Sequence, residues 1–174
     1  MLTKQFNAVI RSFVTDNITL KDVSGTTSTI QSYKSTVNNI TRPCMIPELL
    51  KLVPPYGNAS VGNGPEFAGV NFGDGDTPPT ENDYNLSGSR INTAASVLQI
   101  VKTVTTDGDT FTGVYTLTNV STNDITIKEI ALIGAVYTGS SSGKTYLIDR
   151  NVLAEALTIP AGEVGRITYT ITVS

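Results

Sequence analysis

The groups best placed to do chemistry are acidic side chains crowded into residues 73–84. Four carboxylates occur in this stretch: Asp74, Asp76, Glu81 and Asp83. Carboxylates two residues apart can share a hard cation such as Ca²⁺. Pro78 and Pro79 nevertheless stand where an EF-hand loop needs ligands and a glycine. The segment is therefore a candidate calcium site, and the simpler interpretation is that its Asp side chains cap turns.

The residue types that most enzymes rely on are missing or isolated. The chain has no histidine, which removes the commonest general base, the usual partner of a Ser or Cys nucleophile and the usual zinc ligand. Its single cysteine, Cys44, is expected to be a small buried hydrophobe. The run Gly62-Asn63-Gly64 is followed by Pro65 and lacks the Lys-Ser/Thr pair of a phosphate loop. We therefore expect no enzyme and no cofactor.

Four further acidic residues could form carboxylate pairs of the glycosidase kind, because such partners meet only in space. They fall in predicted strands or turns, where a solvated charge is the simpler interpretation: Glu129, Asp149, Glu155 and Glu163. The chain has no Trp, and aromatic residues make up only 7% of it, so no aromatic sugar platform accompanies them. A polysaccharide hydrolase or a lectin is disfavoured, and a carbohydrate- or host-receptor-binding module stays open as an alternative.

Charge is sparse along the whole chain. Only 16% of the 174 residues are charged, the net charge is −3, and Lys and Arg occur singly rather than in runs. Such a chain offers no basic surface for tracking phosphates and no polybasic membrane anchor. No apolar run approaches the ~18 residues that span a bilayer, and the N-terminus lacks the pattern of a signal peptide. We expect no nucleic-acid or membrane partner, and a protein made in a cytoplasm.

The C-terminal part, residues 96–174, alternates apolar and polar residues between turn signals. Asp107-Gly108 separates two β-branched runs and is the strongest hairpin signal in the chain. Gly113 suggests one bulge, and a slip in the alternation at Lys128-Glu129 suggests another. This spacing predicts an all-β domain, an antiparallel Ig-like β-sandwich that lacks the Cys and Trp signature of true immunoglobulins. The predicted strands are 97–106, 110–120, 125–137, 145–153, 157–159 and 164–173.

Residues 1–41 predict a separate N-terminal unit that would serve as an anchor. Residues 1–14 predict a short amphipathic helix, because apolar side chains recur at helical spacing and form a face that needs a partner. Ile18–Val23 and Thr27–Tyr33 predict two strands around a turn at Ser24-Gly25-Thr26. The polar stretch Thr36–Thr41 is expected to be irregular. The apolar face of the helix consists of Leu2, Phe6, Val9, Ile10 and Phe13.

Residues 42–95 form a long Pro/Gly-rich arm or extended loop. Prolines remove backbone donors and glycines permit positive φ, so long regular elements are excluded at this density. Three rings in the arm could anchor it either to its own domain or to a neighbour. With the apolar face of the helix, they complete the candidate partner-binding residues: Leu2, Phe6, Ile10, Phe13, Phe67, Phe72 and Tyr84.

Several segments together resemble small virion-associated proteins of tailed bacteriophages. Residues 71–86 read NFGDGDTPPTENDYNL and are similar to a "GxGxTPPTxxDYxL" stretch that precedes an all-β domain in that family. Residues 115–120 (YTLTNV) and 125–132 (ITIKEIAL) look like two of its strands, with Ala131 where Gly is common. Residues 157–163 (LTIPAGE) and 167–171 (ITYTI) look like its terminal hairpin. The resemblance covers roughly residues 71–174.

The resemblance implies a non-enzymatic virion protein, with no catalytic residues to carry over. The first expectation is an auxiliary or decoration protein of the capsid, held to neighbouring subunits by its N-terminal segment and arm. Its partners would be other virion proteins, such as the major capsid protein, and further copies of itself in a symmetric array. A collar, neck, tail-tip or fibre-base protein is the alternative within the same class. The protein would be made in the host bacterial cytoplasm and located in the virion.

Overall fold

The structure, a computed structural model, describes residues 18–30, 34–37, 40–43, 69–91, 94–108, 110–137 and 143–172. Ten strands and no helix occur in these ranges, which confirms the all-β class. The helix predicted for residues 1–14 lies outside them. No helix within the described ranges is long and apolar enough to cross a membrane.

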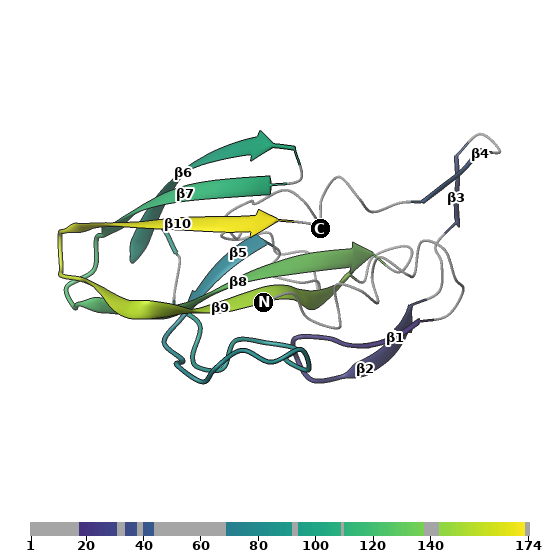
Figure 1. The fold of residues 1–174 in the computed structure, drawn as a ribbon, viewed down its shortest axis with the longest axis horizontal. Coiled ribbons are helices and arrows are strands. Elements are labelled where there is room, and N and C mark those ends of the chain that lie inside the picture. Colours follow the sequence, from purple (N-terminus) through teal and green to yellow (C-terminus); the bar gives the residue numbers. More distant parts are fainter. Residues whose placement is uncertain are drawn as a thin grey trace.

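Two antiparallel three-stranded sheets make up the main body (Figure 1). The first sheet has the order β5-β8-β9 and the second β10-β7-β6. The predicted strand 145–153 and the short strand 157–159 are parts of one continuous strand, β9. The bounds are β5 Gly69–Gly73, β6 Leu98–Asp107, β7 Thr110–Asn119, β8 Ile125–Tyr137, β9 Gly143–Ile159 and β10 Val164–Thr172.

Strand β5 comes from the segment that the sequence assigned to the arm. It pairs antiparallel with β8, from Gly69 opposite Ile133 to Gly73 opposite Glu129. Every residue of β5 is buried. The first sheet therefore takes a strand from upstream of the predicted sandwich, and residues 74–97 connect the two sheets.

Two further hairpins come from the N-terminal part. β1 (Ile18–Lys21) pairs with β2 (Thr27–Ile30) around a turn in which Gly25 has φ of +83°. This confirms the strand pair predicted on either side of Ser24-Gly25-Thr26. β3 (Lys34–Val37) pairs with β4 (Ile40–Pro43), so the expectation of an irregular Thr36–Thr41 was wrong. Two paired strands of four residues each are enough to form this hairpin despite their polar composition.

The core lies between the two sheets, where each strand presents alternate side chains. β10 shows the pattern most clearly, because its residues alternate strictly between exposed and buried. Phe72 of β5 meets Tyr115 of β7 edge to face, with ring centroids 5.8 Å apart and planes at 79°. The buried residues that both sheets contribute include Val70, Phe72, Leu98, Tyr115, Leu117, Ile130, Leu132, Tyr146, Ile148, Ile167, Tyr169 and Ile171.

The hairpin between β6 and β7 forms where the Asp-Gly signal predicted it. Asp107 pairs with Thr110, and Gly108 has φ of +54°, a conformation that favours glycine. The bulge predicted at Gly113 is wrong, because the registers of β7 with β6 and β10 both run through Gly113 without a shift. A Cβ at this position would come within 2.7 Å of the Tyr115 ring. The glycine is needed there to leave room for that ring.

Two irregularities shift the register between β8 and β9. One falls between Ile127 and Glu129, which confirms the bulge predicted from the slip in the alternation. The other falls between Leu132 and Ile133, because their partners Asp149 and Leu147 are two residues apart, with Ile148 between them. An extra residue in one strand changes which face the following side chains take. Strict alternation from Leu147, which lies on the outer face, would place Asp149 on the outer face and Arg150 in the core. In the structure the two positions are reversed.

Asp149 is buried in the core side of this bulge, which corrects the expectation that it is a solvated charge. It is 4% exposed. The Tyr169 hydroxyl of the opposite sheet donates a hydrogen bond to its carboxylate, and Asn151 Nδ2 donates another at 2.8 Å. Burial, followed by the nearby Asp149 charge and this hydrogen bond, raises the pKa of Tyr169 well above its ordinary value. A charge-assisted hydrogen bond thus joins the two sheets.

Replacing Tyr169 by Phe should lower the free energy of unfolding by about 1–3 kcal/mol, because a buried carboxylate loses a donor. Tyr115→Phe is the matched control, since the Tyr115 hydroxyl is buried and has no hydrogen-bond partner in the structure. That change should be neutral or slightly stabilising. Urea unfolding of both variants gives the comparison. Equal losses for the two would show that the Tyr169–Asp149 bond contributes nothing.

Candidate functional site

Residues 74–90, here called the connecting loop, cover the outer face of the β5-β8-β9 sheet (Figure 1). Leu86 of the loop packs in a small second core against Ala131, Ile133 and Leu147, which point away from the main core. The loop returns beside β5, where Arg90 bridges to Gly73 and Ile91 N donates to Phe72 O at 2.9 Å. One apolar residue and two backbone ties therefore fix the ends and middle of a loop that is otherwise polar.

Glu129 of β8 is the acceptor around which the connecting loop is built. It is fully buried, at 0% exposed, which corrects the expectation of an outward-pointing, solvated charge. Its Oε1 accepts hydrogen bonds from Gly75 N at 3.2 Å and Gly88 N at 2.9 Å. Its Oε2 accepts from Ser87 N at 3.0 Å and Ser87 Oγ at 3.1 Å. The first and last parts of the connecting loop are thus both held by hydrogen bonds to one carboxylate.

Arg150 of β9 neutralises Glu129 and ties down the remaining part of the loop. It is 1% exposed, and its Nη1 lies 2.8 Å from Glu129 Oε2. Its Nε donates to Asp83 Oδ2 at 2.8 Å, and its Nη2 lies 2.7 Å from the same oxygen. Nη2 also donates to two loop carbonyls, Thr77 O at 3.1 Å and Pro78 O at 3.2 Å. The planar guanidinium therefore links two carboxylates and the turn at the prolines.

Both carboxylates are held in their ionised form. Burial alone raises the pKa of Glu129, but the hydrogen bonds from Ser87, Gly88 and Arg150 outweigh burial and place the pKa below its ordinary value. The pKa of Asp83 is lowered for the same kind of reason. Desolvation raises this pKa, but the hydrogen bonds from Thr80 and Arg150 outweigh desolvation and bring it below its ordinary value. Thr80 donates to Asp83 through its backbone N at 2.9 Å and its Oγ1 at 2.7 Å. Asp83 therefore caps the turn, as the simpler interpretation predicted.

The four candidate calcium ligands do not converge. Asp83 binds Arg150, and Asp74 Oδ1 accepts from Ser89 N at 2.6 Å. Asp76 pairs with Lys128 at 3.1 Å on the surface. Glu81 is exposed. In the part of the chain that the structure describes, no three acidic, Cys or His side chains come together as a metal site requires.

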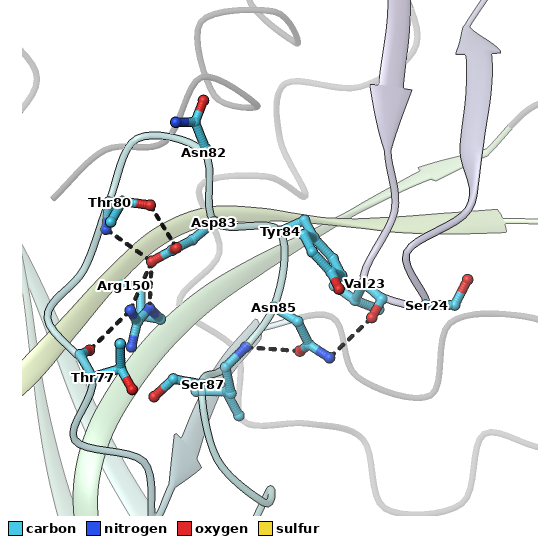
Figure 2. Close-up of a pocket in the computed structure, with 11 residues that line it drawn as sticks. Val23, Ser24, Thr77, Thr80, Asn82, Asp83, Tyr84, Asn85, Ser87 and Arg150 are labelled. Carbon is cyan, nitrogen blue, oxygen red and sulfur yellow. Dashed lines mark hydrogen bonds and ion pairs between the residues drawn. The ribbon is translucent and has the colours of Figure 1, made fainter.

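The turn of the β1–β2 hairpin sits against the connecting loop, and a pocket of about 410 Å³ lies beside it (Figure 2). Asn85 Nδ2 donates to Val23 O at 2.9 Å, and Val23 N donates to Thr145 O of β9 at 3.0 Å. The Lys21 ammonium lies 3.8 Å from the centroid of the Tyr84 ring. Hydroxyl and amide groups line much of the pocket: Ser24, Thr77, Thr80, Asn82, Asn85 and Ser87.

The predicted partner-binding residues fall into three groups. Leu2, Phe6, Ile10, Phe13 and Phe67 lie outside the described residues. Phe72 is 0% exposed in the main core, so its ring anchors β5 to its own domain and does not contact a partner. Tyr84 is half-buried between the connecting loop and the hairpin turn. Of the three rings of the arm, Tyr84 alone is described at a surface position.

The sequence reading missed the central pair, Glu129 and Arg150. Glu129 was assigned to the outer, solvated face, and Arg150 was given no role. A signal for Glu129 was present, because the alternation slips at Lys128-Glu129 and a slip changes the face that a side chain takes. Glu155 and Glu163, in contrast, are exposed as expected.

Asn119, at the end of β7, plays a similar scaffold role. It is 0% exposed. Its Nδ2 donates to Asn123 O and Ile159 O, both at 2.8 Å, and its Oδ1 accepts from Ser121 N at 3.0 Å. Its backbone N and O bond to Glu163 O and Gly162 N at 2.9 and 2.8 Å. One side chain and its backbone thus join the turn after β7 to the turn before β10.

Comparisons with known proteins give no match. No protein-family model fits the chain. No curated protein and no solved structure is similar to it at a significant level.

Proposed function

We propose that this chain is a non-enzymatic structural protein of a tailed-bacteriophage particle, and within the particle an auxiliary or decoration protein of the capsid. The proposal starts from the sequence resemblance of residues 71–174, to which the comparisons add nothing. We also propose that the two sheets form a sandwich of the Ig-like type. Its partners would be the major capsid protein or other virion proteins and further copies of this chain, and its place would be the virion.

The observation that carries the proposal is what the resembling motifs do in the fold. Glu129 and Asn119 are fully buried, and the polar atoms of their side chains form hydrogen bonds that hold loops and strand ends in place. Asp83 and Arg150 hold the turn at Thr77 and Pro78. These polar residues are explained as scaffold, which is the use a rigid building block makes of buried polar networks.

The outer face of the β10-β7-β6 sheet supports the same proposal. Alternate residues of its strands are mostly threonine, and the threonines pair across strands, as in Thr110···Thr172 at 3.1 Å and Thr112···Thr170 at 3.3 Å. Two exposed valines, Val101 and Val164, lie among them at 69% and 59% exposed. Interfaces are depleted in Lys, Glu and Asp compared with other surfaces. A face with few charges suits packing in an assembly.

The proposal is tested by deleting Met1–Val14 and measuring binding to phage heads. The purified full-length and truncated proteins are mixed with particles that lack the native protein, and bound protein is counted after sedimentation. We expect full-length protein to bind and the truncated protein to lose most of its binding, with thermal unfolding of the body unchanged. Full occupancy by the truncated protein would contradict the anchor role, and failure of the full-length protein to bind would contradict the capsid assignment.

A collar, neck, tail-tip or fibre-base position is the alternative within the same class. Such parts form rings, so a fixed ring stoichiometry by native mass measurement or electron microscopy would favour them over a capsid array.

A second candidate function, a carbohydrate- or host-receptor-binding module, is favoured by one observation. The pocket beside the hairpin turn combines hydroxyl and amide groups with the Tyr84 ring, a lining suited to neutral polyols. A glycan array with the full-length protein tests it. Binding that is lost in Asn82→Ala and Tyr84→Ala would support a saccharide site, and absence of binding at high protein concentration would count against it.

A further inference from the structure

Among the described contacts, the β1–β2 hairpin is attached to the body through its turn and the adjoining end of β1. Its two strands pair only with each other. Lys21 and Val23 contact three residues of the body, which are Tyr84, Asn85 and Thr145. Val23 also packs on the small core of the outer sheet face. We call these body residues, with Leu86, the socket. A two-stranded hairpin is marginal alone in water, so the socket is expected to contribute to its stability.

The chain between the hairpin and the body is long. Residues 31–68, 38 in number, separate the end of β2 from the start of β5. The stretch 44–68 alone, if extended, would reach roughly 80 Å at about 3.3 Å per residue. That reach exceeds the width of a domain of this size, whose radius of gyration is about 16 Å. Chain length therefore does not decide which copy of the protein fills a given socket.

We infer that the socket accepts the hairpin of a second copy, so that neighbouring subunits exchange their β1–β2 hairpins. The same hydrogen bonds and apolar contacts form whether the hairpin comes from its own chain or from a neighbour, so exchange costs no interface energy. A connection of this number of residues corresponds to an effective concentration on the order of millimolar for the hairpin at its own socket. Dilute chains therefore close on themselves, and chains at millimolar local concentration exchange.

Exchange matters biologically only if the chain forms the array proposed above, where neighbours are held at such concentrations. Each subunit would then be tied to the next by an element that carries the N-terminal segment with it. The exchange itself is a property of the free protein. It can therefore be tested without particles, and its failure is distinguishable from failure of the virion assignment.

The test uses two full-length variants that can be linked only between chains. Both carry Cys44→Ser, which removes the native thiol. One carries Val23→Cys in the hairpin and the other Thr145→Cys in the socket. Val23 N donates to Thr145 O at 3.0 Å, so the backbones of the two residues are in direct contact where the link is to form. The variants are isotopically distinguished, mixed at about 1 mM or 10 µM, equilibrated and oxidised, and the 23–145 link is measured by mass spectrometry.

At about 1 mM we expect the mixed disulfide in a substantial fraction of chains, and at 10 µM at least tenfold less, because exchange is bimolecular. The control replaces Val23→Cys by Thr27→Cys on the same hairpin, away from the socket. It should link to Thr145→Cys at least tenfold less at 1 mM, because Thr145 is only 6% exposed to random collision. Adding Asn85→Ala to the socket chain should lower the 23–145 yield.

Two results would overturn exchange. The first is a Val23→Cys yield no higher than the Thr27→Cys yield at 1 mM. The second is absence of the mixed disulfide at 1 mM, provided that a chain carrying both Val23→Cys and Thr145→Cys forms the disulfide within itself. If that double variant fails to close at any concentration, the docking of the hairpin on the socket is itself wrong.

Discussion

Replacing Arg150 by Met should lower the free energy of unfolding by about 3–5 kcal/mol. The change leaves the Glu129 carboxylate, which is 0% exposed, without its cationic partner in a place that water does not reach. Removing one member of a buried ion pair typically costs this much, because the remaining charge is uncompensated. The loop also loses the donors to Asp83, Thr77 and Pro78. Urea unfolding with a constant slope measures the difference.

Lys128→Met is the matched control. Lys128 is next to Glu129 in β8 and pairs with Asp76 of the connecting loop at 3.1 Å, but both side chains are exposed, at 39% and 73%. An exposed ion pair contributes about 0–1 kcal/mol. If Arg150→Met costs no more than Lys128→Met, the buried cluster does not hold the loop and its central role is disproved.

Two additional measurements separate loss of charge pairing from loss of packing. Adding Glu129→Gln to Arg150→Met removes the uncompensated charge and should recover at least about 1 kcal/mol. Lowering the pH should also relieve the uncompensated charge in Arg150→Met, because it protonates Glu129. The lowered pKa of Glu129 in the native protein means that its contribution is present above the ordinary carboxyl pKa and is lost as the pH falls through the folded-state value. The variant, whose buried carboxyl protonates more easily, should lose less stability over that range.

The alternation of apolar and polar residues predicted the strands because burial repeats with the period of the pleat. β10 follows this rule at every described position. β9 departs from it, because the register shift at Ile148 places Asp149 in the core and Arg150 on the outer face. A one-residue insertion in a strand leaves no clear compositional mark, and so periodicity alone could not place these two charges. Where a slip was visible, at Lys128-Glu129, the bulge was predicted and the burial of Glu129 was not.

Turn chemistry predicted that residues 73–84 form turns, and Asp83 does cap one. What closes the connecting loop lies far along the chain, since Arg150 is 67 residues from Asp83 and Glu129 is 41 residues from Gly88. Local propensity carries no information about partners at that separation. Proline and glycine likewise hid β5, whose pairing with β8 outweighs the weak strand tendency of its glycines. Three of the four candidate calcium ligands likewise bond to residues that turn chemistry does not identify, since Asp74, Asp76 and Asp83 bond to Ser89, Lys128 and Arg150.

Gly75→Ala should lower the free energy of unfolding by about 2–4 kcal/mol, because the first and last parts of the connecting loop are in close contact at this residue. A Cβ on Gly75 would lie 2.5 Å from Glu129 Oε1 and would overlap Ser87 Oγ and the backbone nitrogen of Gly88. A side chain on Gly88 would in turn approach Gly75 Cα within 2.6 Å. The three atoms that a Cβ on Gly75 would meet all belong to the hydrogen-bond network around the Glu129 carboxylate, so they cannot move aside without breaking those bonds.

Gly108→Ala is the comparison that isolates this steric effect. Nothing lies within 4 Å of a Cβ at Gly108, so the change there costs only the strain of a φ of +54°, about 1–2 kcal/mol. Amide hydrogen exchange locates the damage: Gly75→Ala should release the amides of Ser87 and Gly88, which bond to Glu129, and Gly108→Ala should leave them protected. If Gly75→Ala lowered stability without exposing those amides, close contact between the first and last parts of the loop would not be what holds it. If it released them with the β10-β7-β6 sheet still protected, the loop would be a separate unit of stability on a body that folds without it.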